Sequence, residues 1–300
     1  MKLSPIVLFT YKRLETLKKT IESLSANKLA SLSDLIVYSD GSKTSKDELI
    51  IAEIRSYLKT VSGFKTITIH ESALNKGLAN SIIEGVTEVI NEYGKVIVLE
   101  DDLVCSPNFL NYMNAALDFY SDESKIFSIT GYSIPINFSH PDSDVYFTLR
   151  SSSWGWATWK DRWSIIDWEV QDYSEFKKDK TLRRNFNKTG SDKSRMLDRQ
   201  MQGKINSWAI RWCYSQFKND LFSVHPFVSK IVNIGFNSSD ATNTKEKFSR
   251  YSTKLDVGEK LDFEFSKKYH TESEIIHQFI KPFSIISRIK YRIINLVFKN

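Results

Sequence analysis

The stretch Val96-Ile97-Val98-Leu99-Glu100-Asp101-Asp102 decides the fold of this 300-residue chain, because it joins a buried strand to a cluster of acids. Four consecutive apolar residues predict a strand covered on both faces. Carboxylates at the end of that strand repel one another unless a cation lies among them. Open α/β sheets bind ligands at the carboxyl ends of their strands. The triplet therefore predicts a divalent metal that holds a phosphorylated ligand, or alternatively an acidic turn whose Asp caps the next helix.

Three further strand candidates precede this strand, with starts at Ile6, Leu35 and Thr66. The segments between the runs carry apolar residues at helical spacing, in the sets Leu14, Leu17, Ile21 and Leu24; Ile50, Ile54, Tyr57 and Leu58; and Leu78, Ile82, Val86, Val89 and Ile90. Strands that alternate with amphipathic helices predict βαβ units, so the fold class is α/β with a mostly parallel sheet. A further helix is expected from Pro107 to Tyr120, because proline is favoured in a first turn.

The sequence beyond Ile126 leaves this alternation and is aromatic-rich and irregular through about Trp168. The polar, charged stretch 177–198 is expected to form a mobile loop. A helix that contains residues 207–212 and a strand near residues 224–232 are expected next. The stretch 237–251, rich in Ser, Thr, Asn and Lys, is expected to be a flexible loop.

Composition is ordinary for a soluble globular protein, with 41% hydrophobic and 26% charged residues. No run approaches the roughly 20 apolar residues of a membrane-spanning helix, and the N-terminus lacks a signal-peptide pattern. Cys105 and Cys213 are too few for a disulfide framework, so buried thiols and a cytoplasmic location are expected. Of the net charge of +6, a surplus of five lies in residues 267–300, with seven Lys or Arg against two Glu. The nearly neutral remainder argues against nucleic acid as a partner.

Each of the four expected strands ends in polar residues, namely Phe9 to Arg13, Asp40-Gly41-Ser42, His70-Glu71 and the acidic triplet. The carboxyl ends of parallel strands share one sheet edge, so these clusters predict one ligand site. Taken alone, Asp40 has the alternative role of an Asx turn, and Asn75-Lys76-Gly77 is either a simple turn or a donor of N–H groups and a Lys to phosphate. The chain has no Gly-rich phosphate-binding motif. A metal must then neutralise the phosphate, and acidic oxygen ligands suit Mg²⁺ or Mn²⁺.

Taken together, these motifs resemble those of a family 2 type glycosyltransferase with the GT-A fold. The Glu-Asp-Asp triplet, in place of Asp-x-Asp, is similar to that of the N-acetylglucosaminyltransferase I group and of bacterial surface-polysaccharide glycosyltransferases. Segments 150–159 and 207–212 resemble the bacterial subgroup more specifically, and the resemblance extends to about Gly235. It implies a nucleotide-sugar-binding half over residues 1–125 and an acceptor-binding half of the same domain over 126–255. Residues 256–300 form a C-terminal basic amphipathic helical tail in this division.

The resemblance implies a role for each motif in donor binding. Thr10 and Arg13 would lie near the nucleoside and the diphosphate, and Asp40 would receive the base. Lys76 and Gly77 stand where the family's Asn-x-Gly turn meets the nucleotide. The implied donor is a nucleotide diphosphate sugar, foremost a UDP-sugar.

The acidic triplet would divide its tasks between sugar and metal. Glu100 and Asp101 would contact the ribose and the donor sugar, while Asp102 would bind the Mn²⁺ or Mg²⁺ that bridges the diphosphate. Such a metal neutralises the nucleotide diphosphate as it departs from the sugar. The resemblance thus implies metal-dependent, inverting transfer of a sugar to a glycan acceptor in lipopolysaccharide or capsule synthesis.

An inverting transferase also needs a base for the acceptor hydroxyl. The related Golgi enzyme has acids in the helix that corresponds to residues 208–210, whereas this chain has none there. Asp198 is the preferred candidate, with Asp161 and Asp167 as alternatives, and each has the competing interpretation of a solvated surface acid. His225 is interpreted as a structural histidine rather than a second metal ligand.

Five of the seven tryptophans lie between Trp154 and Trp168. Such a cluster either packs a core or stacks on sugar rings, and Gly155 between Trp154 and Trp156 leaves room for a ligand. Substrate contacts are therefore expected from Trp154, Gly155 and Trp156, and from the later segment that holds Trp208 and Arg211.

The tail places Ile285, Ile286, Ile289, Ile293, Leu296 and Val297 on one helical face and Arg288, Arg292, Asn295 and Lys299 on another. A basic amphipathic helix favours peripheral contact with an anionic membrane, and the alternative is packing on the catalytic domain. A lipid-linked acceptor fits the membrane interpretation.

Two rival functions stay open at this point. A sugar-1-phosphate nucleotidyltransferase shares a related sheet and metal-bound acids, but the Gly-rich loop it needs after the first strand is absent. A non-catalytic carbohydrate-binding or membrane-active protein on the same fold is the second rival, because the acid in the 208–210 helix is missing.

Overall fold

The computed structural model describes residues 2–138, 142–235, 248–269 and 272–297. Its strands are β1 (Ile6–Thr10), β2 (Asp34–Ser39), β3 (Thr66–Glu71), β4 (Lys95–Glu100), β5 (Leu103–Cys105), β6 (Ile126–Thr130), β7 (Val145–Thr148), β8 (Trp156–Trp159), β9 (Phe222–Pro226) and β10 (Ile231–Asn233). Its α-helices are α1 (Leu14–Ser25), α2 (Glu48–Leu58), α3 (Leu78–Tyr93), α4 (Phe109–Phe119), α5 (Lys160–Ser164), α6 (Tyr173–Lys178), α7 (Lys180–Phe186), α8 (Lys193–Met201), α9 (Trp208–Lys218), α10 (Ser273–Ile280) and α11 (Ile285–Val297).

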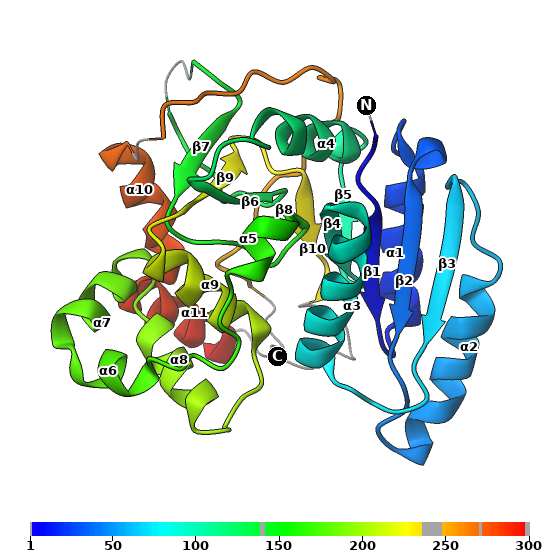
Figure 1. The fold of residues 1–300 in the computed structure, drawn as a ribbon, viewed down its shortest axis with the longest axis horizontal. Coiled ribbons are helices and arrows are strands. Elements are labelled where there is room, and N and C mark those ends of the chain that lie inside the picture. Colours follow the sequence, from blue (N-terminus) through cyan, green and yellow to red (C-terminus); the bar gives the residue numbers. More distant parts are fainter. Residues whose placement is uncertain (1, 139–141, 236–247, 270–271, 298–300) are drawn as a thin grey trace.

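The first half of the chain forms the parallel part of an eight-stranded sheet, whose order is β3-β2-β1-β4-β8-β6-β9-β7. Strands β1 to β4 begin at or within one residue of the predicted starts, and β3, β2, β1 and β4 pair in parallel. Alternate residues of β1 enter opposite core layers: Ile6 and Leu8 pack with α1 and α2, while Val7 packs with α3. Helices thus cover both faces, as Figure 1 shows, and the α/β prediction is confirmed.

The second half continues the same sheet with mixed strand directions. Strand β8 lies antiparallel between β4 and β6, and β9 pairs parallel with β6 and antiparallel with β7. The strand predicted near residues 224–232 is two strands, because the chain leaves the large sheet after Pro226 and forms β10 separately.

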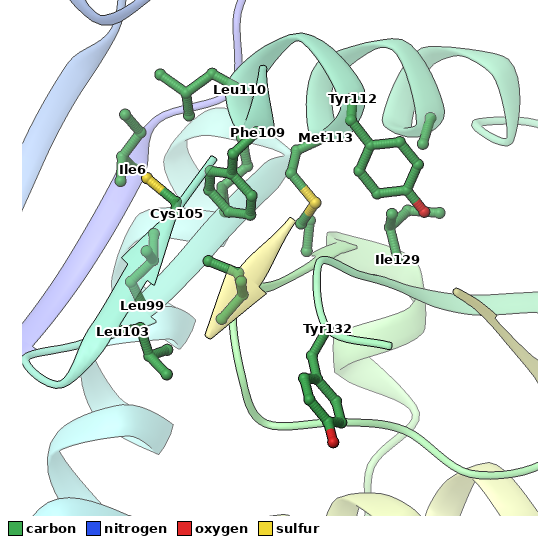
Figure 2. Packing of buried hydrophobic residues seen from close by; sticks show 14 of the residues in the cluster. Ile6, Leu99, Leu103, Cys105, Phe109, Leu110, Tyr112, Met113, Ile129 and Tyr132 are labelled. Atoms are coloured by element: carbon green, nitrogen blue, oxygen red, sulfur yellow. The ribbon is translucent and has the colours of Figure 1, made fainter. Parts of the chain in front are cut away.

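Strand β10 pairs antiparallel with the short strand β5, directly beyond the acidic triplet. In Figure 2 the side chain of Cys105 on β5 lies near Phe109 of α4. These residues belong to the larger of the buried clusters. The ladder therefore ties the end of β4 to residues 231–233, which come from the distant C-terminal half.

The prediction of a mobile loop over residues 177–198 is wrong. Helices α7 and α8 occupy most of that stretch, and Phe186 and Leu197 are buried with Phe176 and Ile210 in a separate cluster. The stretch is polar overall because its few apolar residues all face this small core. The loop predicted over 237–251 lies outside the described residues up to position 247.

The tail divides into a packed part and an exposed part. Residues 256–269 contain no helix; Phe263 and Phe265 pack against α4, with the Phe263 ring 5.4 Å from that of Tyr112. Helix α10 buries Ile275 and Phe279, whereas α11 buries none of its side chains. No helix in the described ranges is long and apolar enough to cross a membrane. Both cysteines are buried and unpaired, as predicted.

Candidate active site

A cavity of about 360 Å³ lies at the carboxyl ends of β1, β2 and β4. It brings together the polar clusters of three of the four predicted strand ends and the turn before α3. Its lining residues are Phe9, Thr10, Tyr11, Lys12, Arg13, Tyr38, Asp40, Lys43, Asn75, Gly77, Leu78, Ser81, Glu100, Asp101 and Asp102. The shared sheet edge inferred from the sequence is therefore a single hollow with three carboxylates at one side.

Asp101 is turned towards the end of β1. Its Oδ2 accepts hydrogen bonds from the Thr10 hydroxyl at 3.0 Å and from the Tyr11 backbone N–H at 3.1 Å. Burial and the neighbouring Asp102 raise the pKa of Asp101 to about 6, although both hydrogen bonds favour the charged form. These contacts place Thr10 and Asp101 as one hydrogen-bonded unit in the cavity wall.

Asp102 connects the N-terminal strands to β10. Its Oδ2 accepts from Arg13 Nη1 at 2.6 Å, and its Oδ1 accepts from Asn233 Nδ2 at 3.3 Å. The backbone N–H of Ile234 donates to the Asp102 carbonyl at 2.9 Å. Gly235 lies so close that a Cβ there would overlap Asp102 Oδ2. Burial raises the pKa of Asp102, and the Arg13 guanidinium opposes that rise.

Glu100 accepts no side-chain hydrogen bond from the described residues, although it lines the same wall. Burial and the charges of Asp102 and Asp101 hold the pKa of its carboxyl well above the ordinary range. Three acids with raised pKa values beside one guanidinium leave unbalanced negative charge, which a bound cation would relieve. The alternative of an acidic helix cap is wrong, because the triplet leads into β5 and Asn108 occupies the N-cap of α4.

The carboxylate oxygens of the acidic triplet suit a cation that is bound partly by the protein and partly by a ligand. No group of three His, Cys, Asp or Glu side chains suited to a metal occurs in the described ranges. A full protein cage is unnecessary for Mg²⁺-like ions, since they are commonly held by one or two carboxylates with substrate phosphates and water. Asp102, partly exposed to the cavity, meets that requirement.

Asp40 organises the turn before α3. Its Oδ1 accepts from the N–H groups of Gly41 and Lys76 at 2.9 and 2.8 Å, and its Oδ2 accepts from Asn75 Nδ2 and the Gly77 N–H at 3.0 and 2.9 Å. A carboxylate has about four lone-pair positions, so this turn fills all of them. Asp40 lines the cavity as predicted, but its hydrogen bonds go to the turn and leave no acceptor for a nucleotide base.

The residues around Asp40 explain why the turn needs two glycines. A Cβ on Gly41 would lie 2.5 Å from the Leu74 carbonyl carbon, so the close approach of the two loops requires glycine there. Gly77 has φ +74° at the N-cap of α3. The Lys76 ammonium points elsewhere and donates to Glu84 at 2.6 Å, outside the cavity lining.

The tryptophan segment is mainly a core. Trp156 is fully buried on β8, and its ring lies 5.2 Å from that of Trp208 and 4.4 Å from that of Trp212. Contact of Trp156 or Trp208 with a sugar is therefore excluded in this conformation. Gly155 has φ +58°, and a Cβ there would lie 2.6 Å from Ile231 Cγ1, so its space is filled by β10 rather than by a ligand.

Trp154 is the one predicted aromatic contact that reaches a cavity. It lines a second hollow of about 230 Å³, together with Tyr132, Arg150, residues 151–153 and Tyr251. The Tyr132 and Trp154 rings pack edge to face at 4.6 Å. Arg211 lies outside this lining, and its guanidinium donates to the Trp168 carbonyl and to Asn206.

The structure does not bring the proposed catalytic base to either cavity. Asp198 forms a two-point ion pair with Arg183, at 2.8 and 2.7 Å, and accepts from the Tyr173 hydroxyl. The Arg183 hydrogen bonds lower the pKa of Asp198, which makes it a weaker base. Asp161 pairs with Arg162, and Asp167 accepts from two backbone N–H groups of the following turn.

His225 is a structural residue, as expected. Its Nδ1 lies 3.1 Å from the Tyr132 carbonyl oxygen, and its Nε2 lies 3.1 Å from both the Arg150 carbonyl oxygen and the Thr148 hydroxyl. Complete burial lowers the pKa of His225 to about 4.

Sequence reasoning missed Lys43, Asn233 and Gly235. Lys43, which follows the Asp40 turn, lines the cavity that contains the acidic triplet. Asn233 and Gly235 reach Asp102 only because β10 pairs with β5, across a sequence separation of 131 residues for Asn233. Their only local signal is the polar and small residues that follow the apolar pair Ile231-Val232.

Comparison with solved structures gives distant likenesses. TarS of S. aureus, in the fragment 1–349, is 9% identical with a TM-score of 0.43, over 79% of this chain and 61% of that one. A mannosyltransferase from Pyrobaculum calidifontis, solved with GDP-Man and Mn²⁺, is 9% identical with a TM-score of 0.32, over 53% and 45%. A UDP-glucose pyrophosphorylase complexed with UDP-glucose is 12% identical with a TM-score of 0.39, over 75% and 90%. The chain thus spans less than two thirds of the TarS fragment, and no curated protein matches it.

The family assignment comes from the sequence itself. Residues 6–194 match the family model described as Glycosyl transferase family 2, which covers more than half of the chain and all of β1 to β8. The mostly parallel sheet flanked by helices agrees with the GT-A fold expected of that family. The chain therefore belongs to glycosyl transferase family 2.

Proposed function

We propose that this protein is a metal-dependent, inverting glycosyltransferase that moves a sugar from a nucleotide diphosphate sugar to a glycan acceptor. The single observation that carries the proposal is that Glu100, Asp101 and Asp102 together line the cavity at the carboxyl edge of the sheet. Family membership supports transfer chemistry, and the charged wall supports a donor that arrives with a divalent cation.

In this proposal Asp102 is the protein ligand of Mn²⁺ or Mg²⁺, and the donor diphosphate supplies further oxygens. When bound, the metal neutralises charge on the departing nucleotide diphosphate. Arg13, which pairs with Asp102 at 2.6 Å and lines the same cavity, would hold a phosphate of the donor. Thr10 holds Asp101 for contact with the donor, and Asp40 fixes the N–H groups of the turn before α3.

The donor and the acceptor are proposed at the level of chemical class. A UDP-sugar is the favoured donor, and the acceptor is a glycan or lipid-linked glycan of bacterial lipopolysaccharide or capsule. The second hollow supports an acceptor site at Trp154, because aromatic rings and the hydroxyls of residues 151–153 line it together. We place the reaction in the cytoplasm, on the inner face of the cell membrane.

Thermal-shift and turnover measurements test the proposal. We expect UDP-sugars with Mn²⁺ to raise the melting temperature and to be hydrolysed slowly, and we expect Asp102→Ala to abolish both effects. Asp118→Ala is the control, because Asp118 is likewise an ion-paired acid, with Lys95 as its partner, and it lies outside the cavity lining.

Each outcome separates the candidates. Stabilisation without hydrolysis would favour the non-catalytic carbohydrate-binding alternative, and release of pyrophosphate from a nucleoside triphosphate would favour a nucleotidyltransferase. If no nucleotide stabilises the protein, or if Asp102→Ala behaves like Asp118→Ala, the proposal fails.

A further inference from the structure

Helix α11 carries an apolar stripe that the rest of the described chain does not cover. Its members are between 54% and 80% exposed, and they are Ile285, Ile286, Ile289, Ile293, Leu296 and Val297. At 3.6 residues per turn these six positions fall within one third of the helix circumference. Soluble proteins rarely leave a contiguous stripe of this kind in water without a partner.

The opposite side of α11 fixes the direction in which the stripe points. Asn295 accepts from the Phe248 N–H and donates to the Phe248 carbonyl oxygen, both at 2.9 Å. Ser287, Arg288, Tyr291 and Ile294 are the other half-buried residues, and they lie on or directly beside that side. The helix is thus held by its polar side with its apolar side turned away from the protein, and the alternative of apolar packing on the domain does not apply to α11.

Basic residues border the stripe on both edges. Lys290 flanks one edge, and Arg292 and Arg288 flank the other, by the same helical geometry. The helix contains no acid, and none of these three side chains forms an ion pair within the described ranges. Long basic side chains beside an apolar face suit a helix that lies flat in a membrane surface, because the stems stay in the apolar layer while the charges reach anionic headgroups.

We propose that α11 is a membrane-docking surface that binds anionic lipid through this stripe and its basic border. Charge complementarity selects this partner over a second copy of the chain, whose α11 would bring the same positive charges to the interface. The inference rests on the proposed membrane location but not on the proposed reaction, because lipid binding needs neither donor nor acceptor.

The docking surface lies next to the proposed acceptor site. Phe279 and Phe283 line the same hollow as Trp154, and both are buried. Ile285, the first residue of α11, follows Phe283 by two positions. Helix α11 on a membrane would therefore keep this hollow near the lipid surface, where a lipid-linked acceptor resides.

Co-sedimentation with vesicles tests the inference on the full chain. We expect binding to vesicles of phosphatidylcholine with phosphatidylglycerol, and little binding to phosphatidylcholine alone. The triple change Arg288→Gln, Lys290→Gln and Arg292→Gln is expected to weaken binding roughly hundredfold, since each basic residue near an anionic surface contributes about a factor of five. Ile286→Glu with Ile293→Glu is expected to abolish it, because carboxylates would enter the apolar layer.

Leu49→Glu is the matched control, because Leu49 is 79% exposed on α2, away from α11, and should bind as the wild type does. The altered side chains are exposed except that of Arg288, which is half-buried, and unchanged circular dichroism will confirm that the variants fold. The inference is overturned if the wild type ignores anionic vesicles, if the α11 variants bind as tightly as Leu49→Glu, or if the stripe instead mediates a dimer that Ile286→Glu dissolves. Failure of donor turnover with intact vesicle binding would refute only the proposed function.

Discussion

Replacing Gly155 by Ala tests whether β10 fills the space beside the tryptophan segment. Two costs are expected. The backbone at φ +58° disfavours a Cβ by about 1 kcal/mol, and the new Cβ would lie 2.6 Å from Ile231 Cγ1 in a packed core, where overpacking costs about 2 kcal/mol more. We therefore expect Gly155→Ala to lower the free energy of unfolding by about 3 kcal/mol.

Gly203→Ala is the matched control, because Gly203 has φ +68° but no atom within 4 Å of the Cβ position. It should cost only the backbone part, about 1 kcal/mol. Denaturant unfolding gives both values, and a double-mutant cycle with Ile231→Ala should recover most of the difference. Equal costs at the two glycines, or no coupling to Ile231, would refute the packing argument and return Gly155 to a role in ligand approach.

Three further outcomes follow from the described contacts. Asp40→Ala should lower the free energy of unfolding by about 3 kcal/mol, because one buried and three half-exposed donors lose a charged acceptor. The control Asp34→Ala, at the other end of β2, should cost less than about 1 kcal/mol. Similar costs for the two variants would contradict the role of Asp40 in holding the turn. Burial lowers the pKa of His225 from 6.5 to about 4, so between these pH values only the unfolded chain takes up the proton. The free energy of unfolding should therefore fall by about 3 kcal/mol as the pH falls through that window. Denaturation curves of His225→Gln should lack this pH dependence. Asp198→Asn should lower stability by about 1 kcal/mol through the lost Arg183 pair and leave donor hydrolysis unchanged, whereas loss of transfer alone would restore Asp198 as the base.

The parallel half of the fold was predictable because its strands are continuous apolar runs. The runs in β1, β2 and β4 are mostly buried on both faces, so the residues themselves mark the strand, and the polar residues at its end mark the shared edge. The edge strand β3 instead alternates Thr and Ile and buries none of its residues completely. Burial of Ile6 to Phe9 and of Val96 to Leu99 bears out that logic. The same logic located the cavity, since three strands and one turn deliver their polar ends to it.

The other half could not be predicted with the same rules. Strand β8 is four residues long and reads Trp-Ala-Thr-Trp, a pattern that does not distinguish a core strand from an aromatic ligand wall. Residues 177–198 contain only a few apolar residues, which pack in a small separate core, while the other faces of their helices are charged. The hydrogen-bond partners of Asp198 and Asp40 are brought to them by tertiary structure. Composition alone could therefore not show that both carboxylates already accept hydrogen bonds from the protein.

The β5–β10 ladder also has a consequence for the order in which the site is built during synthesis. The acids of the triplet leave the ribosome long before Asn233, which contacts Asp102 from 131 residues further along the chain. A nascent chain that ends after β8 contains the parallel strands β1 to β4, but it lacks Asn233, one hydrogen-bond partner of Asp102. Under the proposed function, we therefore expect donor binding only after β10 has been translated and has paired with β5.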